Sequence, residues 1–442
     1  MEVQMDSSLV KLAQNSTETT IGPKVIPNDP TPQDQAIYIL SVSPKFATDI
    51  HFGNWKRPLP HGMQNQDLNF LDANNPLFYA PHVMSSAGQA LRLNDTGIIT
   101  QRDRVSTCLL TDSSGFQISQ QTGKINDMRD RGAILDWIQN RADMSMTLDI
   151  PTANVGKGGY PFNTITACRD RTLDHLRFFE KHHKPGQVTW LNVVQANSHG
   201  SGYDWYQAVK KFDFCDGWAI AGKMRKSFTY VLSLLLRMME EGTIQNKKWV
   251  HLLGSQELWI AVLLTAVQRG LNANGCNLRI SFDTSTACTM IRTNDVFTLP
   301  NFSDDDLLLP AKRAPDHKRM FNSTVQWPWP SAIGDRLTLG DINVASWGKS
   351  QYCRDNLSNT LMMLHNYASV RETILLANRI MDAQQASREH VIAPKLSKCV
   401  GIVRQIFDAG PIKGREILEQ NRTKFNALTA RSFYESDRGD ED

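Results

Sequence analysis

The middle of the chain alternates between short apolar runs and longer segments with helical periodicity. The short runs that predict β-strands are 107–111, 144–150, 188–195, 217–221, 249–254 and 278–283. The segments between them include 164–182, 227–241 and 257–269, where apolar residues recur at helical spacing. Strands that alternate with helices indicate a parallel sheet, so the sequence predicts an α/β fold built from repeated strand–helix units.

The same pattern divides the chain into four regions. Residues 1–35 are polar and rich in proline, which is typical of an irregular arm rather than a packed element. A barrel with insertions is predicted over 36–350. Strand signals fade after about 350, and the spacing of apolar residues predicts a helical C-terminal extension over 351–434. The acidic run 435–442 predicts a disordered tail.

The overall composition excludes several classes of protein. Hydrophobic residues make up 41% of the chain and charged residues 21%, which suits a globular protein with a sizeable core. The net charge of +3 does not by itself indicate a polyanionic partner, so a nucleic-acid surface would need local clusters of basic residues. The longest mostly apolar run, 228–236, is far shorter than the ~20 residues of a membrane span. The first residues lack the pattern of a secretory signal.

The seven cysteines are scattered along the chain, and no two form a C-x-x-C pair. A disulfide framework or a zinc knuckle needs closer, paired spacing. The sequence therefore predicts a reduced, cytoplasmic protein (in the host cytoplasm if the chain is viral) that holds no metal and no other cofactor.

Each predicted strand ends in a polar residue or a glycine, and these ends are Asp112, Asp149, Gln195, Gly222, Gly254 and Asp283. In a parallel barrel the carboxyl ends of all strands share one face, and this face carries the active site. A single aspartate at a strand end is more often a helix N-cap than a catalyst. Six such ends in succession favour one shared pocket.

Several of these strand ends are similar to motifs of one enzyme family. Residues 109–117, Leu-Leu-Thr-Asp-Ser-Ser-Gly-Phe-Gln, closely resemble the L-T-D-S-G-G-F-Q segment of tRNA-guanine transglycosylases. In the same order along the chain, 193–195 resembles that family's I-V-Q segment, 217–222 its G-x-A-I-G-G turn, 252–254 its L-M-G segment and 282–283 its F-D pair. The resemblance covers about residues 95–290. It implies a TIM (β/α)8 barrel that exchanges guanine for a deazaguanine base.

The resemblance implies two catalytic residues. Asp283 would attack C1′ of the nucleotide and form a covalent glycosyl-enzyme, as in retaining glycoside hydrolysis. Asp112 would act as general acid for the departing guanine and then as general base for the incoming base.

The resemblance also implies a set of residues that bind the base. Asp149 would accept hydrogen bonds from N1–H and the amino group of guanine, and Gln195 and the backbone N–H of Gly222 would address O6. The remaining members lie in the same motifs and would contact the base or its two faces: Ser113, Phe116, Ala221 and Leu253. Without the motifs, Phe116 and Leu253 would be assigned to the core and Gly222 to a turn.

The chain departs from the family pattern in four respects. Ser114 replaces a glycine, and Ala221 replaces the first glycine of the G-G pair. Residues 222–227, Gly-Lys-Met-Arg-Lys-Ser, stand where the bacterial tRNA enzymes carry G-L-A-V-G-E. The zinc signature C-x-C-x-x-C is absent downstream of the barrel, where Cys353 and Cys399 are the only cysteines. These departures, the N-terminal arm and the helical extension are more similar to the phage enzymes that insert deazaguanine into DNA.

The sequence therefore predicts a phage DNA-guanine transglycosylase that hides DNA from restriction enzymes, which read N7 and O6 of guanine in the major groove. Its partners would be DNA, with the target base flipped out, and a free 7-deazaguanine base; no membrane partner is expected. Lys223, Arg225 and Lys226 are expected to hold the DNA backbone. With Ser227 in place of the family's glutamate, they favour a neutral 7-substituent such as cyano over a cationic aminomethyl group. Two alternatives stay open: a tRNA-acting enzyme with the same chemistry, and a non-catalytic barrel subunit that binds nucleic acid.

Overall fold

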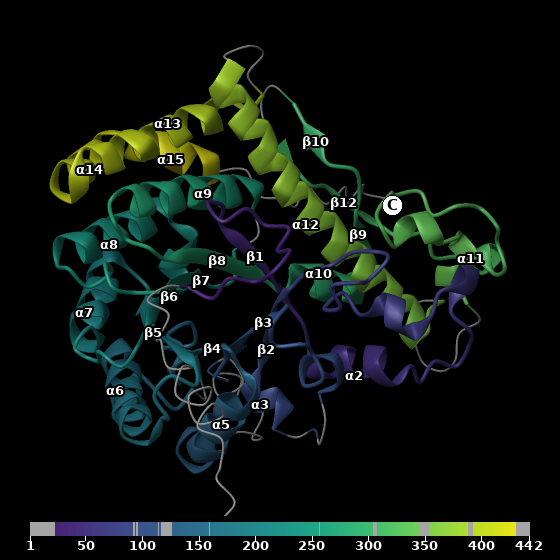
Figure 1. Cartoon of the computed structure of the whole chain (residues 1–442), viewed down its shortest axis with the longest axis horizontal. Helices are drawn as coiled ribbons and strands as arrows, with labels where there is room; N and C mark the ends of the chain where they lie inside the picture. Colours follow the sequence, from purple (N-terminus) through teal and green to yellow (C-terminus); the bar gives the residue numbers. More distant parts are fainter. Residues whose placement is uncertain are drawn as a thin grey trace, which may run out of the picture.

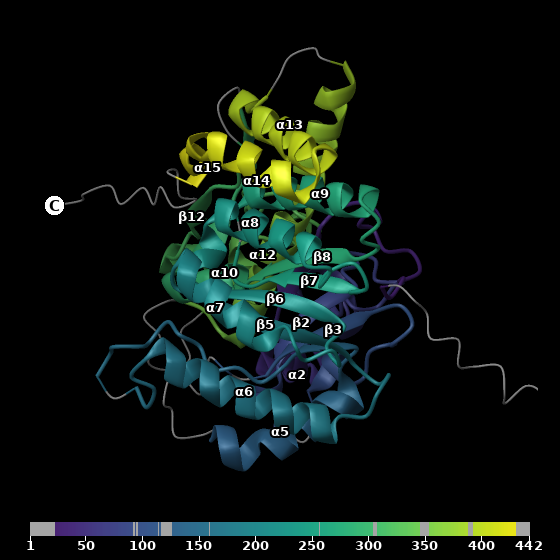
Figure 2. The ribbon, with the colours of Figure 1, turned by 90° about the vertical axis from the view of Figure 1, so that its left-hand side faces the viewer.

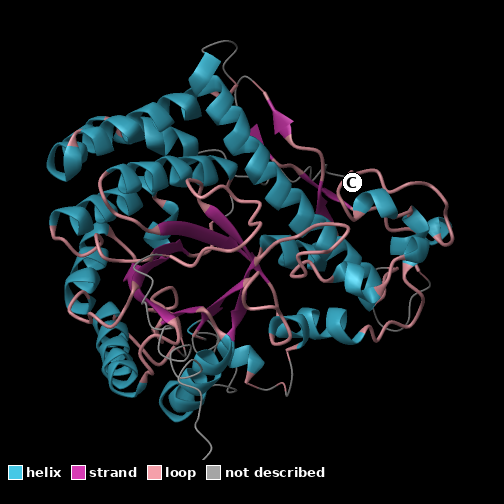
Figure 3. Cartoon of the chain, viewed as in Figure 1, coloured by secondary structure: helices cyan, strands magenta, loops and turns pink. Residues whose placement is uncertain are grey.

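A closed barrel of eight parallel strands forms the centre of the computed structural model (Figure 1, Figure 3). The structure describes residues 23–91, 93, 96–113, 115, 126–158, 160–255, 257–303, 307–344, 353–387 and 392–429. The strands are β1 (Ile37–Ser41), β2 (His82–Ser86), β3 (Cys108–Asp112), β4 (Met144–Met146), β5 (Thr189–Ala196), β6 (Gly217–Gly222), β7 (Trp249–Leu252) and β8 (Arg279–Thr284). Each strand pairs in parallel with the next, and β8 closes on β1. The predicted TIM barrel is confirmed.

The six predicted strands correspond to β3 through β8, and β4 ends at Met146, four residues before its predicted end. The helices are α2 (Pro44–Phe52), α3 (Ala87–Ala90), α5 (Asp127–Arg141), α6 (Ile165–His182), α7 (His199–Val209), α8 (Phe228–Glu240), α9 (Leu258–Ala273), α10 (Thr286–Thr289), α11 (Leu339–Ile342), α12 (Asn356–Ser387), α13 (Pro394–Asp408), α14 (Gly410–Gln420) and α15 (Arg422–Thr429). The side chains of Thr164, Ser198 and Ser227 accept hydrogen bonds from backbone N–H groups in the first turns of α6, α7 and α8. Such N-caps satisfy donors that the helix itself leaves unpaired, so they define where each helix begins after its loop.

Alternate residues of the strands fill the interior of the barrel. The buried apolar members of this inner cluster are Ile26, Ile37, Ile39, Met84, Cys108, Leu110, Met144, Met146, Leu191, Val193, Ala219, Ala221 and Trp249. Side chains that lie two residues apart on a strand share a face. Asp112 follows Leu110 by two residues and Gln195 follows Val193 by two, so both polar side chains belong to the inner face at the carboxyl end of the barrel.

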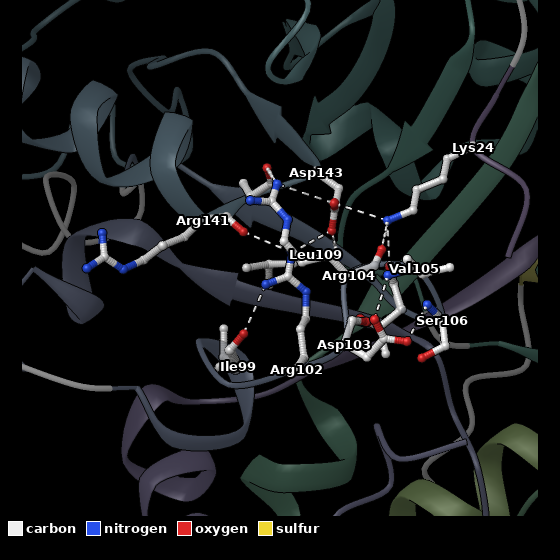
Figure 4. Close-up of polar contacts among 12 residues, drawn as sticks. Lys24, Ile99, Arg102, Asp103, Arg104, Val105, Ser106, Leu109, Arg141 and Asp143 are labelled. Atoms are coloured by element: carbon white, nitrogen blue, oxygen red, sulfur yellow. Dashed lines mark hydrogen bonds and ion pairs between the residues drawn. The ribbon is translucent and has the colours of Figure 1, made fainter. Parts of the chain in front are cut away.

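The N-terminal arm closes the opposite, amino end of the barrel. Residues 23–35 form no helix or strand, as predicted, but Ile26 is only 3% exposed and belongs to the inner cluster. The ammonium group of Lys24 donates to the carbonyl of Thr107 (2.6 Å) and pairs with Asp143 (3.0 Å), next to Arg102 (Figure 4). The expectation of an unpacked arm is therefore corrected for 23–35, because an open barrel end would expose its apolar interior. Residues 1–22 lie outside the described part of the chain.

The chain after β8 completes the wall of helices and adds an outer layer. Two small antiparallel sheets, β9 (Asp295–Phe297) with β12 (Ala311–Arg313) and β10 (Asn301–Phe302) with β11 (Leu307–Leu308), precede α12. Helix α12 contacts α9, β1 and β9, so it covers the barrel although it follows the predicted boundary at 350. Helices α13, α14 and α15 stack beyond α8 and α9 (Figure 2), which confirms a helical extension. The predicted tail 435–442 lies outside the described residues.

Two further observations bear on the chemistry of the chain as a whole. In the part of the chain that the structure describes, no helix combines the length and the apolar character that crossing a membrane requires. All seven cysteines lie in that part, and each is a free thiol rather than half of a disulfide.

Candidate active site

The carboxyl end of the barrel brings the predicted site residues of five strands to one mouth. Asp112 ends β3, Gln195 lies at the end of β5, Gly222 ends β6, and Asp283 lies at the end of β8. Asp149 follows β4 by three residues. Because all eight strands run parallel, these positions share the face on which barrel enzymes carry their active sites.

Asp149 and Gln195 are joined directly in the buried floor of this mouth. Nε2 of Gln195 donates to Oδ2 of Asp149 at 2.7 Å. Gln195 is 5% exposed and Asp149 is 7% exposed. The hydroxyl of Thr152 lies 3.4 Å from Oε1 of Gln195, but its one hydrogen has a closer acceptor in Oδ1 of Asn197 at 2.9 Å, so the bond to Asp149 sets the orientation of the amide group. A primary amide carries two N–H donors, so Gln195 keeps one donor for a ligand.

The Asp149 carboxyl is held in an unusual electrostatic situation. Burial raises its pKa from 3.8 to about 6, the hydrogen bond from Gln195 lowers it in part, and the nearby charge of Asp112 raises it further. Carboxyl groups whose pKa is raised by burial and by a neighbouring carboxylate are common in functional sites. Near neutral pH Asp149 is a buried, mostly ionised acceptor, and among the described residues Gln195 is the one side chain that donates to it, which suits a ligand that brings N–H groups.

Gly222 is required by the close packing of β5 and β6. Its φ of +82° lies in the left-handed region that favours glycine, and a Cβ atom there would lie 2.4 Å from the carbonyl oxygen of Ala196. The preceding residue, Ala221, is 4% exposed and packs in the inner cluster of the barrel. The methyl group of Ala221 therefore faces the barrel interior, and the close approach of the backbone is preserved at Gly222.

The end of β7 and the residues just after it provide two hydrogen-bond contacts to Asp283. The backbone N–H of Gly254 donates to its Oδ1 at 2.9 Å, and Nε2 of His251 lies 3.2 Å from the same oxygen. Gly254 has a φ of +63°, a conformation that glycine adopts at little cost and that turns its N–H toward the carboxylate. The side chain of Asp283 is 6% exposed, so it lies deep in the mouth.

The three basic residues after β6 do not form one group. Lys223 and Lys226 are exposed, but Arg225 is only partly exposed and donates from Nη1 to the carbonyl of Gly222 at 2.5 Å. A Cβ atom at position 254 would lie 3.0 Å from Nε of Arg225, so the guanidinium occupies the space that Gly254 leaves. Burial lowers the pKa of Arg225, and the charge of Asp283 acts in the opposite direction.

The expectation that Arg225 binds the DNA backbone together with the two lysines stays a prediction, but the structure places Arg225 differently from them. Its guanidinium is turned inward across the turn and lies in the electrostatic field of Asp283, whereas the lysines remain at the rim. The physical reason is the missing side chain at Gly254, which opens room for a long planar group.

The remaining predicted base contacts divide into three cases. Leu253 is partly buried and packs against the inner cluster, at the level of the mouth. Ser113 is 1% exposed and its hydroxyl donates to the carbonyl of Thr147 at 2.9 Å, so its only hydrogen already ties the ends of β3 and β4 together. Phe116, like Ser114, lies outside the described residues.

Three buried residues of the site were not found from the sequence, namely Trp249, His251 and Ser281. They lie below Asp283 on the inner faces of β7 and β8, where His251 pairs in register with Ser281. The signal was present in the alternation of the two strands, W-V-H-L-L and R-I-S-F-D, which places a histidine and a serine among inward positions. Attention to the ends of the strands alone passes over these positions.

The sequence matches none of the known protein-family models against which it was compared, and no curated protein matches it. Among the described residues, no group of three or more histidine, cysteine, aspartate or glutamate side chains is arranged to hold a metal ion. The function must therefore be argued from the geometry of the mouth.

Proposed function

We propose that this chain is a DNA-guanine transglycosylase of the tRNA-guanine transglycosylase superfamily, which replaces guanine in DNA with a 7-deazaguanine. The observation that carries the proposal is the convergence of three buried or half-buried aspartates, Asp112, Asp149 and Asp283, on the carboxyl end of one closed barrel. Each lies at a position that the sequence motifs assign to this chemistry.

The two catalytic carboxylates come from opposite parts of the barrel wall. Asp112 ends β3 and Asp283 ends β8, and β1 and β2 lie between these strands in the closed sheet. A nucleotide that enters the mouth between them would present C1′ to Asp283 and its base to Asp112. Asp283 displaces guanine from C1′ and becomes a glycosyl ester, while Asp112 gives its proton to the departing base.

The Asp149–Gln195 pair supports recognition of guanine. Ionised Asp149 accepts from N1–H and from the amino group of the base, and the second N–H of Gln195 donates to O6. Adenine would present an unprotonated N1 to the carboxylate, and two acceptors would then face each other in a buried site. This mismatch gives the strongest selection for guanine, since unpaired buried polar groups are costly.

DNA is proposed as the polymer rather than tRNA because the sequence lacks the zinc signature C-x-C-x-x-C downstream of the barrel. Lys223 and Lys226 are exposed beside the mouth and suit phosphate groups without a base preference. A tRNA-acting enzyme with the same chemistry is the second candidate. A non-catalytic barrel is disfavoured, because it needs neither Asp112 nor Asp283.

Exchange of labelled guanine into duplex DNA, single-stranded DNA and tRNA tests the proposal. The wild-type protein should label DNA and form an adduct with DNA that survives denaturing electrophoresis. Asp283→Asn should abolish both signals, whereas Asp213→Asn, which changes an exposed aspartate at the amino end of the barrel, should leave both intact. Labelling of tRNA alone would support the second candidate, and no labelling of any polymer would overturn the proposal.

The incoming base is expected to carry a neutral 7-substituent such as cyano. Arg225 lies beside Asp283, and Lys223 and Lys226 add positive charge to the same turn, so an aminomethyl cation would be repelled. The preference should be about tenfold when the two bases compete for one DNA substrate. Arg225→Met should reduce it, and Lys181→Met, at an exposed site on α6, should not. A preference for the aminomethyl base in the wild-type protein would contradict this expectation.

A further inference from the structure

A chain of hydrogen bonds runs through the barrel interior beneath Asp283. The indole Nε1 of Trp249 lies 2.6 Å from Oγ of Ser281, which in turn lies 2.8 Å from Nδ1 of His251. Nε2 of the same imidazole lies 3.2 Å from Oδ1 of Asp283. His251 and Ser281 have no exposed surface at all, so no water competes for these contacts from outside.

The donors in this chain determine the tautomer of His251. The indole N–H of Trp249 can only donate, so Oγ of Ser281 accepts from it. The hydroxyl hydrogen of Ser281 is then directed to Nδ1 of His251, which must be unprotonated to accept it. The imidazole consequently carries its hydrogen on Nε2 and donates to Asp283. A doubly protonated imidazole would leave the hydroxyl hydrogen of Ser281 without an acceptor among the described residues.

Both donors to the Asp283 carboxylate contact the same oxygen. His251 and the backbone of Gly254 donate to Oδ1. Within the described part of the chain, no hydrogen bond reaches Oδ2. The two oxygens of the carboxylate are therefore inequivalent: one is anchored to the barrel, and the other is available to react.

We infer that His251 is a positioning residue that orients the nucleophile by holding Oδ1, so that Oδ2 of Asp283 attacks C1′. The inference rests on the proposed function and adds which oxygen reacts and which buried side chain directs it. A lone pair of Oδ2 forms the bond to C1′, and the C1′–N bond breaks with its electron pair leaving on guanine, which takes a proton from Asp112. Oδ1 becomes the carbonyl oxygen of the ester and keeps its two donors.

The same donors act again when the incoming base is attached. The ring nitrogen of the incoming base forms a bond to C1′ with its electron pair, the C1′–Oδ2 bond breaks and its electron pair returns to the carboxylate, and Asp112 accepts the proton that this nitrogen loses. The N–H groups of His251 and Gly254 stabilise the negative charge that returns to the carboxylate. Because both donors are neutral, they hold the carboxylate in place without the full charge pairing that would make it a poor nucleophile.

Three variants separate positioning from packing. His251→Phe keeps a ring and removes the donor, His251→Gln restores an N–H donor near the position of Nε2, and Ser281→Ala leaves the imidazole free to move its hydrogen. A control exists in His175, which is equally buried and places Nε2 3.2 Å from Oδ2 of Asp127, in the helical layer between α5 and α6 rather than in the barrel interior. His175→Phe thus removes the same kind of pair from a part of the barrel without proposed chemistry.

The measured quantities are the single-turnover rate of the covalent DNA adduct and the KM for guanine. His251→Phe should slow adduct formation about 10²-fold, as expected for a misplaced reacting group, with KM for guanine within about twofold of wild type. His251→Gln should recover most of this loss. Ser281→Ala should form the adduct at a rate between those of His251→Phe and wild type, and His175→Phe should form it at the wild-type rate. A His251→Phe protein that is folded and forms adduct at the wild-type rate would overturn the inference.

A second measurement does not depend on activity. Nuclear magnetic resonance of protein containing isotope-labelled histidine, with the His251→Gln variant identifying one signal among 11 histidines, reports the tautomer directly. The Nε2–H tautomer is expected at neutral pH, and a hydrogen on Nδ1 would overturn the inference even in an active enzyme. If wild-type protein forms no adduct, the proposed function fails, while this spectrum still accepts or rejects the hydrogen-bond chain.

Discussion

The two ends of β4 carry aspartates in opposite electrostatic situations. At the amino end, Oδ1 of Asp143 pairs with Lys24, and Oδ2 accepts from Arg102 at 2.6 Å and from the backbone N–H of Leu109 at 2.9 Å (Figure 4). Burial alone would raise the pKa of this carboxyl, but the charges of Arg102 and Lys24 outweigh it, and the pKa of Asp143 is lowered.

At the carboxyl end, six residues later, Asp149 forms no ion pair with any cation in the described part of the chain. Its contacts are the neutral amide of Gln195 and the charge of Asp112, and burial raises its pKa to about 6. The two aspartates thus belong to one strand–loop unit, yet one is saturated with positive partners and the other is left short of donors.

The different partners of Asp143 and Asp149 indicate that the two ends of the barrel have different roles. The amino end joins the N-terminal arm, β3 and β4 through ion pairs that no ligand is needed to complete. The carboxyl end keeps a buried acceptor whose pKa is raised, which costs stability in the free protein at neutral pH and which a ligand with N–H groups would offset. Barrel enzymes generally separate stability and catalysis between the two ends in this way.

The largest expected effect comes from Asp149→Asn. Replacing the acceptor by an amide removes two charge-assisted hydrogen bonds to guanine and should lower exchange about 10³-fold, or about 4 kcal/mol. The same change should stabilise the free protein at pH 7, by at most about 3 kcal/mol, because it removes a buried charge whose pKa is raised by about two units. Exchange assays and urea unfolding measure the two effects. Unchanged exchange, or a clear loss of stability, would contradict the assignment.

Asp143→Asn should have the opposite effects: it should lower the stability of the protein and leave exchange nearly unchanged. Removing one partner of a buried ion pair leaves Arg102 uncompensated, and its side chain is only 1% exposed. We expect the free energy of unfolding to fall by about 3 kcal/mol. Exchange measured well below the unfolding temperature should stay within twofold of wild type, since the change lies at the far end of the barrel. A selective loss of exchange without loss of stability would remove the contrast between the two ends.

The pH dependence of guanine binding should report on Asp149 without any substitution. Affinity for free guanine depends on ionised Asp149, so it should fall by about tenfold per pH unit below pH 6, where the carboxyl becomes protonated. Calorimetric titration of the protein with guanine between pH 5 and 8 measures this, and a flat profile would refute it.

Stability should respond to pH with opposite signs at the two positions. The pKa of Asp149 is raised on folding, so its contribution favours the folded state below pH 3.8 and is lost as pH rises toward 6. The pKa of Asp143 is lowered, so its contribution is present above 3.8 and is lost as pH falls further. Comparison of wild type with Asp149→Asn across pH 4 to 7 should isolate the first effect.

The sequence predicts the barrel well where periodicity is strong. Strands β3 through β7 are mostly apolar, because both faces of a parallel barrel strand are covered. Strand β2, His-Val-Met-Ser-Ser, was not predicted, since three of its five residues are polar and its buried histidine pairs with Asp29 of the arm. The pair of His82 and Asp29 joins segments far apart in the sequence, so no local pattern predicts it.

The site was predictable only for residues that lie in strand-end motifs. Asp149 and Gln195 meet because β4 and β5 are neighbours, which the order of the strands already implies. The inward turn of Arg225 depends on the space above Gly254, a contact between two loops that periodicity does not encode. The role of His251 could not be predicted for a related reason. The alternation of β7 indicates an inward polar residue at this position, but its partner Ser281 lies on the next strand.

The smallest expected effect concerns the exposed charges at the two ends. If the carboxyl end binds DNA, each phosphate contact contributes about 0.9 to the slope of log affinity against log salt concentration. The double change Lys223→Ala and Lys226→Ala should reduce the slope by up to about 2, so a fourfold rise in salt concentration should lower the affinity of the variant roughly tenfold less than that of the wild type. The matched control is Lys181→Ala with Lys184→Ala, two exposed lysines in the last turn of α6 and just after it, at the amino end, which should leave the slope unchanged. Arg225→Ala should alter the slope less than either rim lysine, because its guanidinium is turned toward Gly222 and Asp283 rather than toward solvent. Equal changes in slope for the rim and control pairs would show that DNA, if it binds, does not prefer the mouth of the barrel.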